Sequence, residues 1–275
     1  MCAATRAEES QHPQALFQDL LAWHLAGVEG RRAPMGSWIL VPRTRYGDNV
    51  LVSAYSRQKT PCRQLVLLGA GFDARAFRTF SSPEQSGQNG TLQLSDLTVF
   101  EVDQPTTFDV KEAILNYPNV KSRCPLTVKD RRVVPVDFTQ QESWADKLLQ
   151  NGFDPSVPTV WLLEGLLYYL SDSTVDDLAR DVGRLSAANS VLFFDSVTHD
   201  YRYAGVAPGG APFISGNDDY GRLWRKYGFE VVVHDFEHVR VSRERQRLEM
   251  ATHAPLLPRH CRGKNKVLFV EGKKR

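Results

Sequence analysis

The chain has 275 residues, of which 42% are hydrophobic and 24% charged, and its formal net charge is +2. This length and apolar content predict one domain with a substantial core, and the near-neutral charge argues against a broad nucleic-acid or membrane surface. The four cysteines are dispersed without metal-binding spacing, and no apolar run is long enough to span a membrane. We therefore expect a cytoplasmic protein with reduced thiols, no metal site and no signal peptide.

Apolar residues at helical spacing predict an N-terminal helix over Pro13–Gly27, which would cover a sheet or a pocket. After it, short β-rich runs alternate with helical patterns, as in a doubly wound α/β fold. The predicted strands are Gln64–Leu68, Thr98–Val102, Arg132–Val136, Thr159–Leu163, Val191–Asp195, Glu230–His234 and Lys266–Val270. The predicted helices between them are Ala74–Thr79, Pro105–Asn116, Glu142–Asn151, Asp172–Ala187 and Asp218–Tyr227. No clear crossover helix joins the last two strands, which predicts a mostly parallel seven-stranded sheet with one antiparallel edge strand.

The first strand ends in Gly69, Ala70 and Gly71, and an acidic residue, Asp73, follows. Glycines at the end of a parallel strand let a ligand approach the backbone, and the helix expected next offers free N–H groups. The third glycine of the dinucleotide fingerprint is missing, and a carboxylate suits a cationic or zwitterionic ligand better than a pyrophosphate. S-Adenosyl-L-methionine carries a sulfonium and an ammonium, so the pattern favours a methyltransferase. A turn whose glycines serve only packing fits the pattern about as well.

Carboxylates also end the next two strands. Asp103, ahead of Pro105, can accept hydrogen bonds from both hydroxyls of a ribose, although an N-cap of the following helix needs the same residue type. Asp137 can accept from the exocyclic amine of adenine while Phe138, or its backbone N–H, meets the ring. The alternative for this second pair is a strand-end turn with a core phenylalanine.

Glu164 interrupts an otherwise apolar run at the end of the fourth strand. Burying a carboxylate without a partner would cost several kcal/mol, so Glu164 must meet a cation, hydrogen-bond donors or a cavity. It is therefore a candidate site residue, with a structural ion pair to an arginine as the alternative.

Taken in order, the segments GAGFDAR, FEVDQP, VPVDF and EGLLYYL, preceded by PRTRYGD, resemble the leucine carboxyl methyltransferase family and its bacterial O-methyltransferase relatives. The resemblance runs from about Arg43 to Val197. It implies a Rossmann-like class I methyltransferase fold, with a helical cap over residues 1–60 and a core over residues 61–275 of a single domain. It also implies S-adenosyl-L-methionine as the cofactor.

The same resemblance assigns roles to individual residues. Gly69, Ala70 and Gly71 would contact the methionyl part of the cofactor, and Arg43 or Arg45 would meet its carboxylate, since a guanidinium pairs a carboxylate through two hydrogen bonds. The remaining positions are Asp103 for the ribose, Asp137 and Phe138 for the adenine, and Glu164 for the amino-acid end.

These expectations amount to an O-methyltransferase acting on a carboxylate or hydroxyl, either of a small molecule or at the C-terminus of a protein. The segment after Val197 lacks the pattern expected for a phosphatase substrate, so the acceptor stays open, as does the oligomeric state. A carboxylate acceptor needs no base. His199 is the one reasonable base for a hydroxyl, and we assign no catalytic residue. A nicotinamide-dependent oxidoreductase and a non-catalytic interaction module with the same fold are the alternatives.

Overall fold

The computed structural model describes residues 1–32, 37–81, 91–140, 143–204, 211–236, 239–242, 247–250 and 266–275. Within these residues, no helix has both the length and the apolar character needed to cross a membrane. The α-helices are α1 (Cys2–Ser10), α2 (Ala22–Arg32), α3 (Ser37–Tyr55), α4 (Pro105–Leu115), α5 (Pro118–Arg123), α6 (Trp144–Gln150), α7 (Asp172–Arg184), α8 (Tyr201–Ala204) and α9 (Tyr220–Lys226). Two short 3-10 helices are η1 (Arg75–Phe77) and η2 (Leu167–Tyr169).

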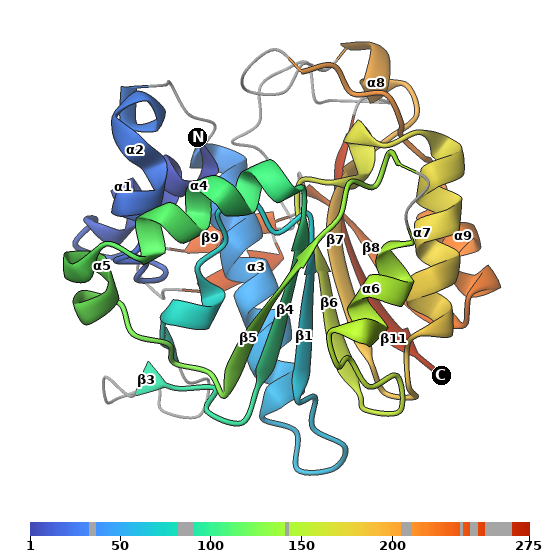
Figure 1. Cartoon of the computed structure of the whole chain (residues 1–275). Coiled ribbons are helices and arrows are strands. Elements are labelled where there is room, and N and C mark those ends of the chain that lie inside the picture. Colours follow the sequence, from blue (N-terminus) through green and yellow to red (C-terminus); the bar gives the residue numbers. More distant parts are fainter. Residues whose placement is uncertain are drawn as a thin grey trace.

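Seven strands form the central sheet, in the order β5-β4-β1-β6-β7-β11-β8 (Figure 1). They are β1 (Gln64–Leu68), β4 (Thr98–Asp103), β5 (Asp130–Pro135), β6 (Thr159–Leu163), β7 (Val191–Val197), β8 (Phe229–Asp235) and β11 (Val267–Lys274). Parallel pairing joins β5, β4, β1, β6 and β7, whereas β11 runs antiparallel to both β7 and β8. The predicted α/β sheet of seven strands is confirmed. Its antiparallel strand lies one place inside the edge, because β8 pairs with the outer side of β11.

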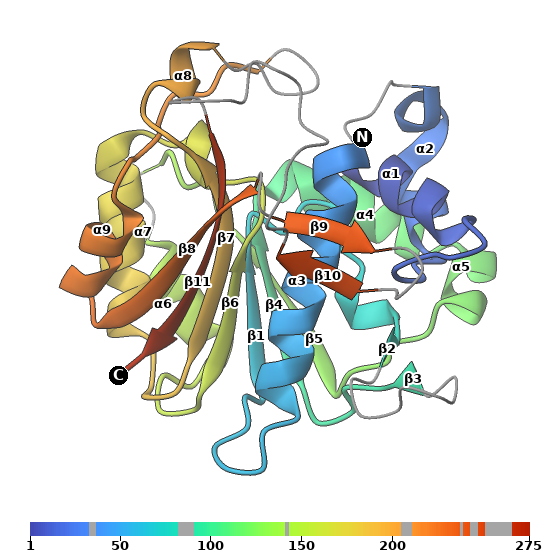
Figure 2. The same ribbon diagram turned by 180° about the vertical axis from the view of Figure 1, so that it is seen from behind.

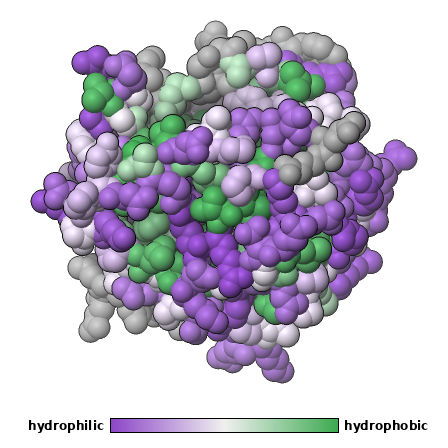
Figure 3. Space-filling view, in the orientation of Figure 1, coloured by the Kyte–Doolittle hydropathy of each residue, from purple (hydrophilic) through white to green (hydrophobic). Residues whose placement is uncertain are grey.

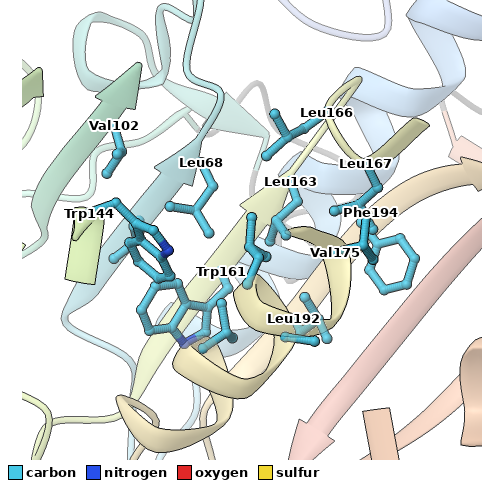
Figure 4. Packing of buried hydrophobic residues seen from close by; sticks show 14 of the residues in the cluster. Leu68, Val102, Trp144, Trp161, Leu163, Leu166, Leu167, Val175, Leu192 and Phe194 are labelled. Carbon is cyan, nitrogen blue, oxygen red and sulfur yellow. The ribbon is translucent and has the colours of Figure 1, made fainter. Parts of the chain in front are cut away.

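Helices α6, α7 and α9 cover one face of the sheet (Figure 1). Their apolar side chains pack on alternate residues of the strands, and Trp144 of α6 and Trp161 of β6 are among the bulkiest in this cluster (Figure 4). Figure 3 shows that the outer surface on the side of α7 and α9 is mainly hydrophilic, as expected for amphipathic helices on a sheet. This face gives the strands a rigid support, so that their carboxyl ends can hold polar groups in fixed positions.

Helix α3 covers the opposite face, together with the hairpin of β9 (Val239–Ser242) and β10 (Arg247–Met250) (Figure 2). Leu51 and Ala54 of α3 belong to the same buried hydrophobic cluster as Leu65 and Leu67 of β1. Because both faces are covered, β1 is buried along its whole length, which explains its unbroken apolar sequence. A second small pair, β2 (Phe80–Ser81) and β3 (Thr91–Leu92), lies outside the main sheet.

The predicted helix over Pro13–Gly27 is wrong, because α1 and α2 are separate helices with turns between them. Asp19 lies in the connection between the two helices. Its carboxylate accepts a hydrogen bond from the backbone N–H of Ala22, the first residue of α2, at 2.9 Å and another from Arg6 Nε of α1 at 2.8 Å. Leu16 is buried, but Leu20 is 68% exposed, so the apolar residues do not share one helical face.

The predicted helix over Ala74–Thr79 is also wrong, since only the single turn η1 forms there. The Asp73 carboxylate accepts from the Arg75 backbone N–H at 2.7 Å, and the Arg75 side chain turns inward to buried carboxylates. Local side-chain hydrogen bonds of this kind compete with a regular helix. The glycines after β1 are therefore followed by a single 3-10 turn and not by the N-terminus of a regular α-helix. The predicted helices that became α4, α6, α7 and α9 are confirmed within a few residues.

Candidate functional site

A cavity of about 400 Å³ lies at the carboxyl ends of β1 and β6, where residues of α1 and α3 close over it. Ligand-binding crevices in open α/β sheets lie at this end of the strands. The volume is within the range of pockets that hold small cofactors. Its main walls are residues 67–73 at the end of β1 and beyond it, residues 164, 165, 168 and 169 after β6, Leu40 and Arg43 of α3, and Met1 together with Cys2, Ala3 and Arg6 of α1.

The predicted glycine segment lines this cavity. Gly69 and Gly71 have positive φ angles of +69° and +49°, a conformation that side chains other than glycine rarely adopt. A Cβ on Gly69 would lie 3.0 Å from Leu166, whereas a Cβ on Gly71 would have nothing within 4 Å. Ala70 lies between them and donates its N–H to the carbonyl of Val102. The space beside Gly71 is therefore open to the cavity, so a ligand could approach the backbone at this position.

Asp103 fixes this glycine segment from the neighbouring strand. One carboxylate oxygen accepts from the Gly71 N–H at 2.7 Å, and the other accepts from the Gln104 N–H at 2.7 Å and the Thr107 hydroxyl at 2.9 Å. Gln104, and not Asp103, is the N-cap residue of α4. A carboxylate has about four acceptor positions, so three donors leave one for a ligand hydroxyl.

Asp137 and Phe138 lie beyond the end of β5, the strand that pairs with β4 at Asp103. None of these three residues is among those that line the cavity. Asp137 accepts from the backbone N–H and the hydroxyl of Thr139, and these hydrogen bonds lower its pKa. The Phe138 ring packs edge-on against Trp144 at 6.3 Å. The local turn positions Asp137, and packing against the core positions Phe138.

The two candidate arginines of α3 point to different places. Arg43 lines the cavity, where its guanidinium lies 3.1 Å from Asp195 and 3.5 Å from Glu164. Arg45 donates to the carbonyl of Leu16 at 2.9 Å and lines a separate cavity of about 310 Å³ behind α3. The structure therefore brings Arg43, and not Arg45, together with the other candidate residues.

Glu164 lies at the centre of a buried ion-pair network. Arg75 Nη2 is 2.6 Å from one of its carboxylate oxygens, and Arg43 Nε is 3.5 Å from the other. Burial raises the pKa of Glu164, although both arginines act in the opposite direction. An arginine ion pair and a position in the cavity wall, which the sequence presented as alternatives, are both present.

Asp73 meets the same arginine. Its carboxylate lies 2.5 Å from Arg75 Nη1. Burial alone would raise the pKa of Asp73, but the charges of Arg75, Arg6 and Arg78 outweigh it and hold the pKa at about 2. Asp73 is therefore ionised at neutral pH, in the wall of the cavity.

Sequence reasoning missed three residues of this site. Asp195 of β7 is 1% exposed and accepts from the Gly165 N–H at 2.6 Å, from Arg43 at 3.1 Å and from the Tyr168 hydroxyl at 3.3 Å. Arg6 of α1 lies across the opening, paired with Asp19 and donating to the carbonyl of Phe72. Arg75 lies within the predicted helix over Ala74–Thr79, which assigned it no role in the site. Of the missed residues, only Asp195 could have been noticed in the sequence, because it is a charged residue inside the apolar strand VLFFDSV.

Aromatic residues lie beside the cavity on the side of η2. The Tyr168 ring is 4.6 Å from Tyr169 and 4.5 Å from Phe213, and Tyr201 stacks on Phe213 at 5.9 Å. Burial raises the pKa of Tyr168 well above its usual range, so its hydroxyl stays protonated. The side chain of Tyr203 lies outside the described residues.

His199 lies elsewhere. It lines a larger cavity of about 560 Å³ between the N-terminal ends of α7 and α9, and its Nδ1 is 3.4 Å from Asp200. Arg202 pairs with Asp172 of that cavity at 3.4 Å. Among the described residues, no group of three or more histidine, cysteine or acidic side chains is arranged to hold a metal ion.

Comparisons with known proteins identify relatives of this chain. A protein from Parafrankia sp. (strain EAN1pec), named "Putative S-adenosyl-L-methionine-dependent methyltransferase", is 37% identical over 202 residues, which cover 68% of this chain and 58% of that protein. A protein of the same description from Frankia alni is 36% identical over 204 residues, which cover 68% of this chain and 64% of that protein. The match therefore spans less than two thirds of the length of these relatives.

Solved structures show the same fold. A crystal structure described as that of a "putative methyltransferase" from Thermobifida fusca matches this structure with a TM-score of 0.52 at 17% sequence identity. The match covers 98% of this chain and 94% of the chain in that structure. A DUF574 family protein from Streptomyces avermitilis has a TM-score of 0.52 at 11% identity and covers 100% and 97%. The leucine carboxyl methyltransferase family matches residues 1–183 of the 275. That match shows that the chain belongs to the leucine carboxyl methyltransferase family.

Proposed function

We propose that the protein is an S-adenosyl-L-methionine-dependent O-methyltransferase that transfers a methyl group to a carboxylate or hydroxyl oxygen. The observation that carries the proposal is the cavity beside Gly71, in which an anionic group, Glu164, and cationic groups, Arg43 and Arg6, face the same space. The amino-acid end of the cofactor is a zwitterion, so it needs an acceptor for its ammonium and a cation for its carboxylate. The residues present fit that requirement.

In this proposal, Glu164 accepts from the ammonium, and Arg43, assisted by Arg6, binds the carboxylate. Asp103 uses its remaining acceptor position for a ribose hydroxyl and keeps Gly71 in place. Asp137 and Phe138 are assigned to the adenine end, on the β5 side of the site. The bound cofactor would supply a methyl group on a sulfonium. Because the leaving group is then a neutral thioether, the protein has little charge to stabilise on it.

The protein's main contribution is then positioning and exclusion of water. Tyr168, Tyr169 and Phe213 form an aromatic wall against which an acceptor can pack. Of the described side chains that line the cavity, none is a histidine, and both acidic ones are ion-paired. A carboxylate acceptor requires no base, so this lining favours a carboxylate over a hydroxyl.

Calorimetry with S-adenosylmethionine and S-adenosylhomocysteine, each with and without a chelator, tests cofactor use. We expect binding of both without any effect of the chelator, and no binding of NAD, which would bind to an oxidoreductase. Heat with NAD alone, or loss of binding on chelation, would refute the proposal. The acceptor class follows from labelled methyl transfer into fractionated cell extract: a methyl ester releases labelled methanol in mild base, whereas a methyl ether does not.

A further inference from the structure

Lys111 of α4 is a buried charged residue to which the proposed function assigns no role. Its side chain is fully buried, and its ammonium lies 2.7 Å from the carboxylate of Glu101 on β4, which is fully buried as well. Burial of an ammonium is costly unless hydrogen-bond partners replace the lost water. The second partner of Lys111 Nζ is the backbone carbonyl of Asp73, at 2.7 Å, in the wall of the cavity.

The loop of residues 69–73 forms one wall of the cavity and is attached to β4 and α4 at both of its ends. At its start, the first two backbone N–H groups donate to the carbonyl of Val102 at 2.9 and 3.1 Å. At its end, the carbonyl of Asp73 accepts from Lys111. A buried backbone carbonyl requires such a donor. The hydrogen bond from Lys111 therefore restricts where the far end of the loop can lie.

Lys111 belongs to a cluster of ion pairs between β4, β5 and α4. Arg131 of β5 donates to Glu101 at 2.7 and 2.9 Å and pairs with Glu112 of α4 at 2.7 Å. Among the described residues, the cluster consists of two cations and two carboxylates, Lys111, Arg131, Glu101 and Glu112. Because these charges are equal in number, we ascribe the effect of Lys111 on a ligand to the position of the loop and not to a net charge.

We infer that Lys111 is a positioning residue for the cofactor, which holds the loop of residues 69–73 in the conformation that binds the methionyl part. The inference rests on the proposed function. Lys111 is fully buried and is not among the residues that line the cavity, so it acts through the Asp73 carbonyl and does not touch the ligand. Without this hydrogen bond, binding must first order the loop, and that ordering lowers the affinity.

Calorimetry with S-adenosylhomocysteine compares Lys111→Met with Arg131→Met, the matched control. Each variant removes one of the two cations that hold Glu101, so each should lower Tm by roughly 5–15 °C. Lys111→Met also removes the hydrogen bond to the loop and should weaken binding by about tenfold. Arg131→Met should change the affinity by less than about twofold, because the hydrogen bonds of Arg131 go to the two carboxylates.

The double variant Glu101→Gln/Lys111→Met removes the same hydrogen bond without leaving a carboxylate short of a cation. Replacing both members of a buried ion pair is tolerated better than removing one, so this variant tests the inference even if Lys111→Met does not fold. It should show the same loss of about tenfold. Normal affinity in the double variant would overturn the inference.

Amide hydrogen exchange of the ligand-free proteins gives a readout that a general loss of stability does not reproduce. The amides of residues 69–77 should exchange faster in Lys111→Met than in Arg131→Met, since only the first variant releases the loop. Equal exchange of this segment in the two variants, or equal losses of affinity, would overturn the inference. Normal binding of S-adenosylhomocysteine by Lys111→Met refutes this inference alone, whereas absence of binding by the unmodified protein refutes the proposed function as well.

Discussion

Gly47 lies on the face of α3 that the buried ion pairs cover, and a methyl group at this position should disrupt them. A Cβ built on Gly47 would lie 2.7 Å from Arg75 Nη2 and closer still to Glu164 Oε1. Both atoms end flexible side chains, but each is held by the other in an ion pair of 2.6 Å. Gly47→Ala can therefore be accommodated only if Arg75 and Glu164 separate.

The size of the effect follows from two opposing terms. Alanine favours a helix over glycine by about 1 kcal/mol. Breaking a buried ion pair costs about 3–5 kcal/mol. The free energy of unfolding should fall by about 2–4 kcal/mol, which corresponds to a decrease in Tm of roughly 5–10 °C for a chain of this size. Affinity for S-adenosylhomocysteine should fall by about tenfold or more, because Glu164 is displaced.

Thermal unfolding and calorimetry measure these two quantities on the same preparation. Gly30→Ala is the matched control, because Gly30 is also helical and its added Cβ would meet only ordinary contacts at 3.7 and 3.8 Å. It should be neutral or stabilising by up to about 1 kcal/mol. If Gly47→Ala were as stable as Gly30→Ala and bound S-adenosylhomocysteine normally, the ion-pair network would not be packed tightly against α3.

Further variants test individual residues. Arg43→Ala and Glu164→Gln should each weaken binding of S-adenosylhomocysteine by about 2–5 kcal/mol but leave binding of 5′-methylthioadenosine, which has no amino-acid end, nearly unchanged. Arg45→Ala is the control and should affect binding of neither ligand. Equal losses for both ligands in the first two variants would mean that Arg43 and Glu164 only maintain the fold. Asp103→Ala should weaken binding of both nucleosides by about 1.5–3 kcal/mol; unchanged affinity with a lowered Tm would show a purely structural role. Because the pKa of Asp73 is lowered from 3.8 to about 2, its carboxylate stabilises the folded protein above pH 3.8, and this contribution disappears as the pH falls towards 2. Asp73→Asn should therefore cost about 2 kcal/mol in urea unfolding at pH 7 and about half of that at pH 3, whereas a pH-independent cost would contradict the ion pair with its arginines.

The inner strands β1, β6 and β7 could be predicted from the sequence because most of their residues are apolar and β-branched or aromatic residues are frequent among them. Val191–Val197 and Gln64–Leu68 are buried at every position, so their burial left a direct compositional signal. The position of β11 within the sheet left no such signal, since strand order depends on contacts between distant segments. In the segment after Pro13, the apolar residues have helical spacing although no single helix forms there. Some of them are buried and others are exposed, so the spacing did not reflect one helical face.

Candidate site residues could be proposed from the sequence where they lie at or just beyond the carboxyl end of a strand, as Gly71, Asp103 and Glu164 do. The choice between Arg43 and Arg45 could not be made, because two positions along α3 rotate the side chain to a different side of the helix. The role of Arg75 was hidden for another reason. A single arginine in a short turn looks like an exposed residue until three carboxylates from different elements surround it.

The position of β11 has a consequence for how the chain acquires its structure during synthesis. Residues 267–274 pair on one side with β7 and on the other with β8, and β8 has no other partner in the central sheet. Until these residues leave the ribosome, β7 presents an unpaired edge and the segment of β8 has no sheet to join. Unpaired edges promote association between nascent chains. The dependence of folding on chaperones in the cell should therefore increase with the time that β11 takes to pair with β7 and β8.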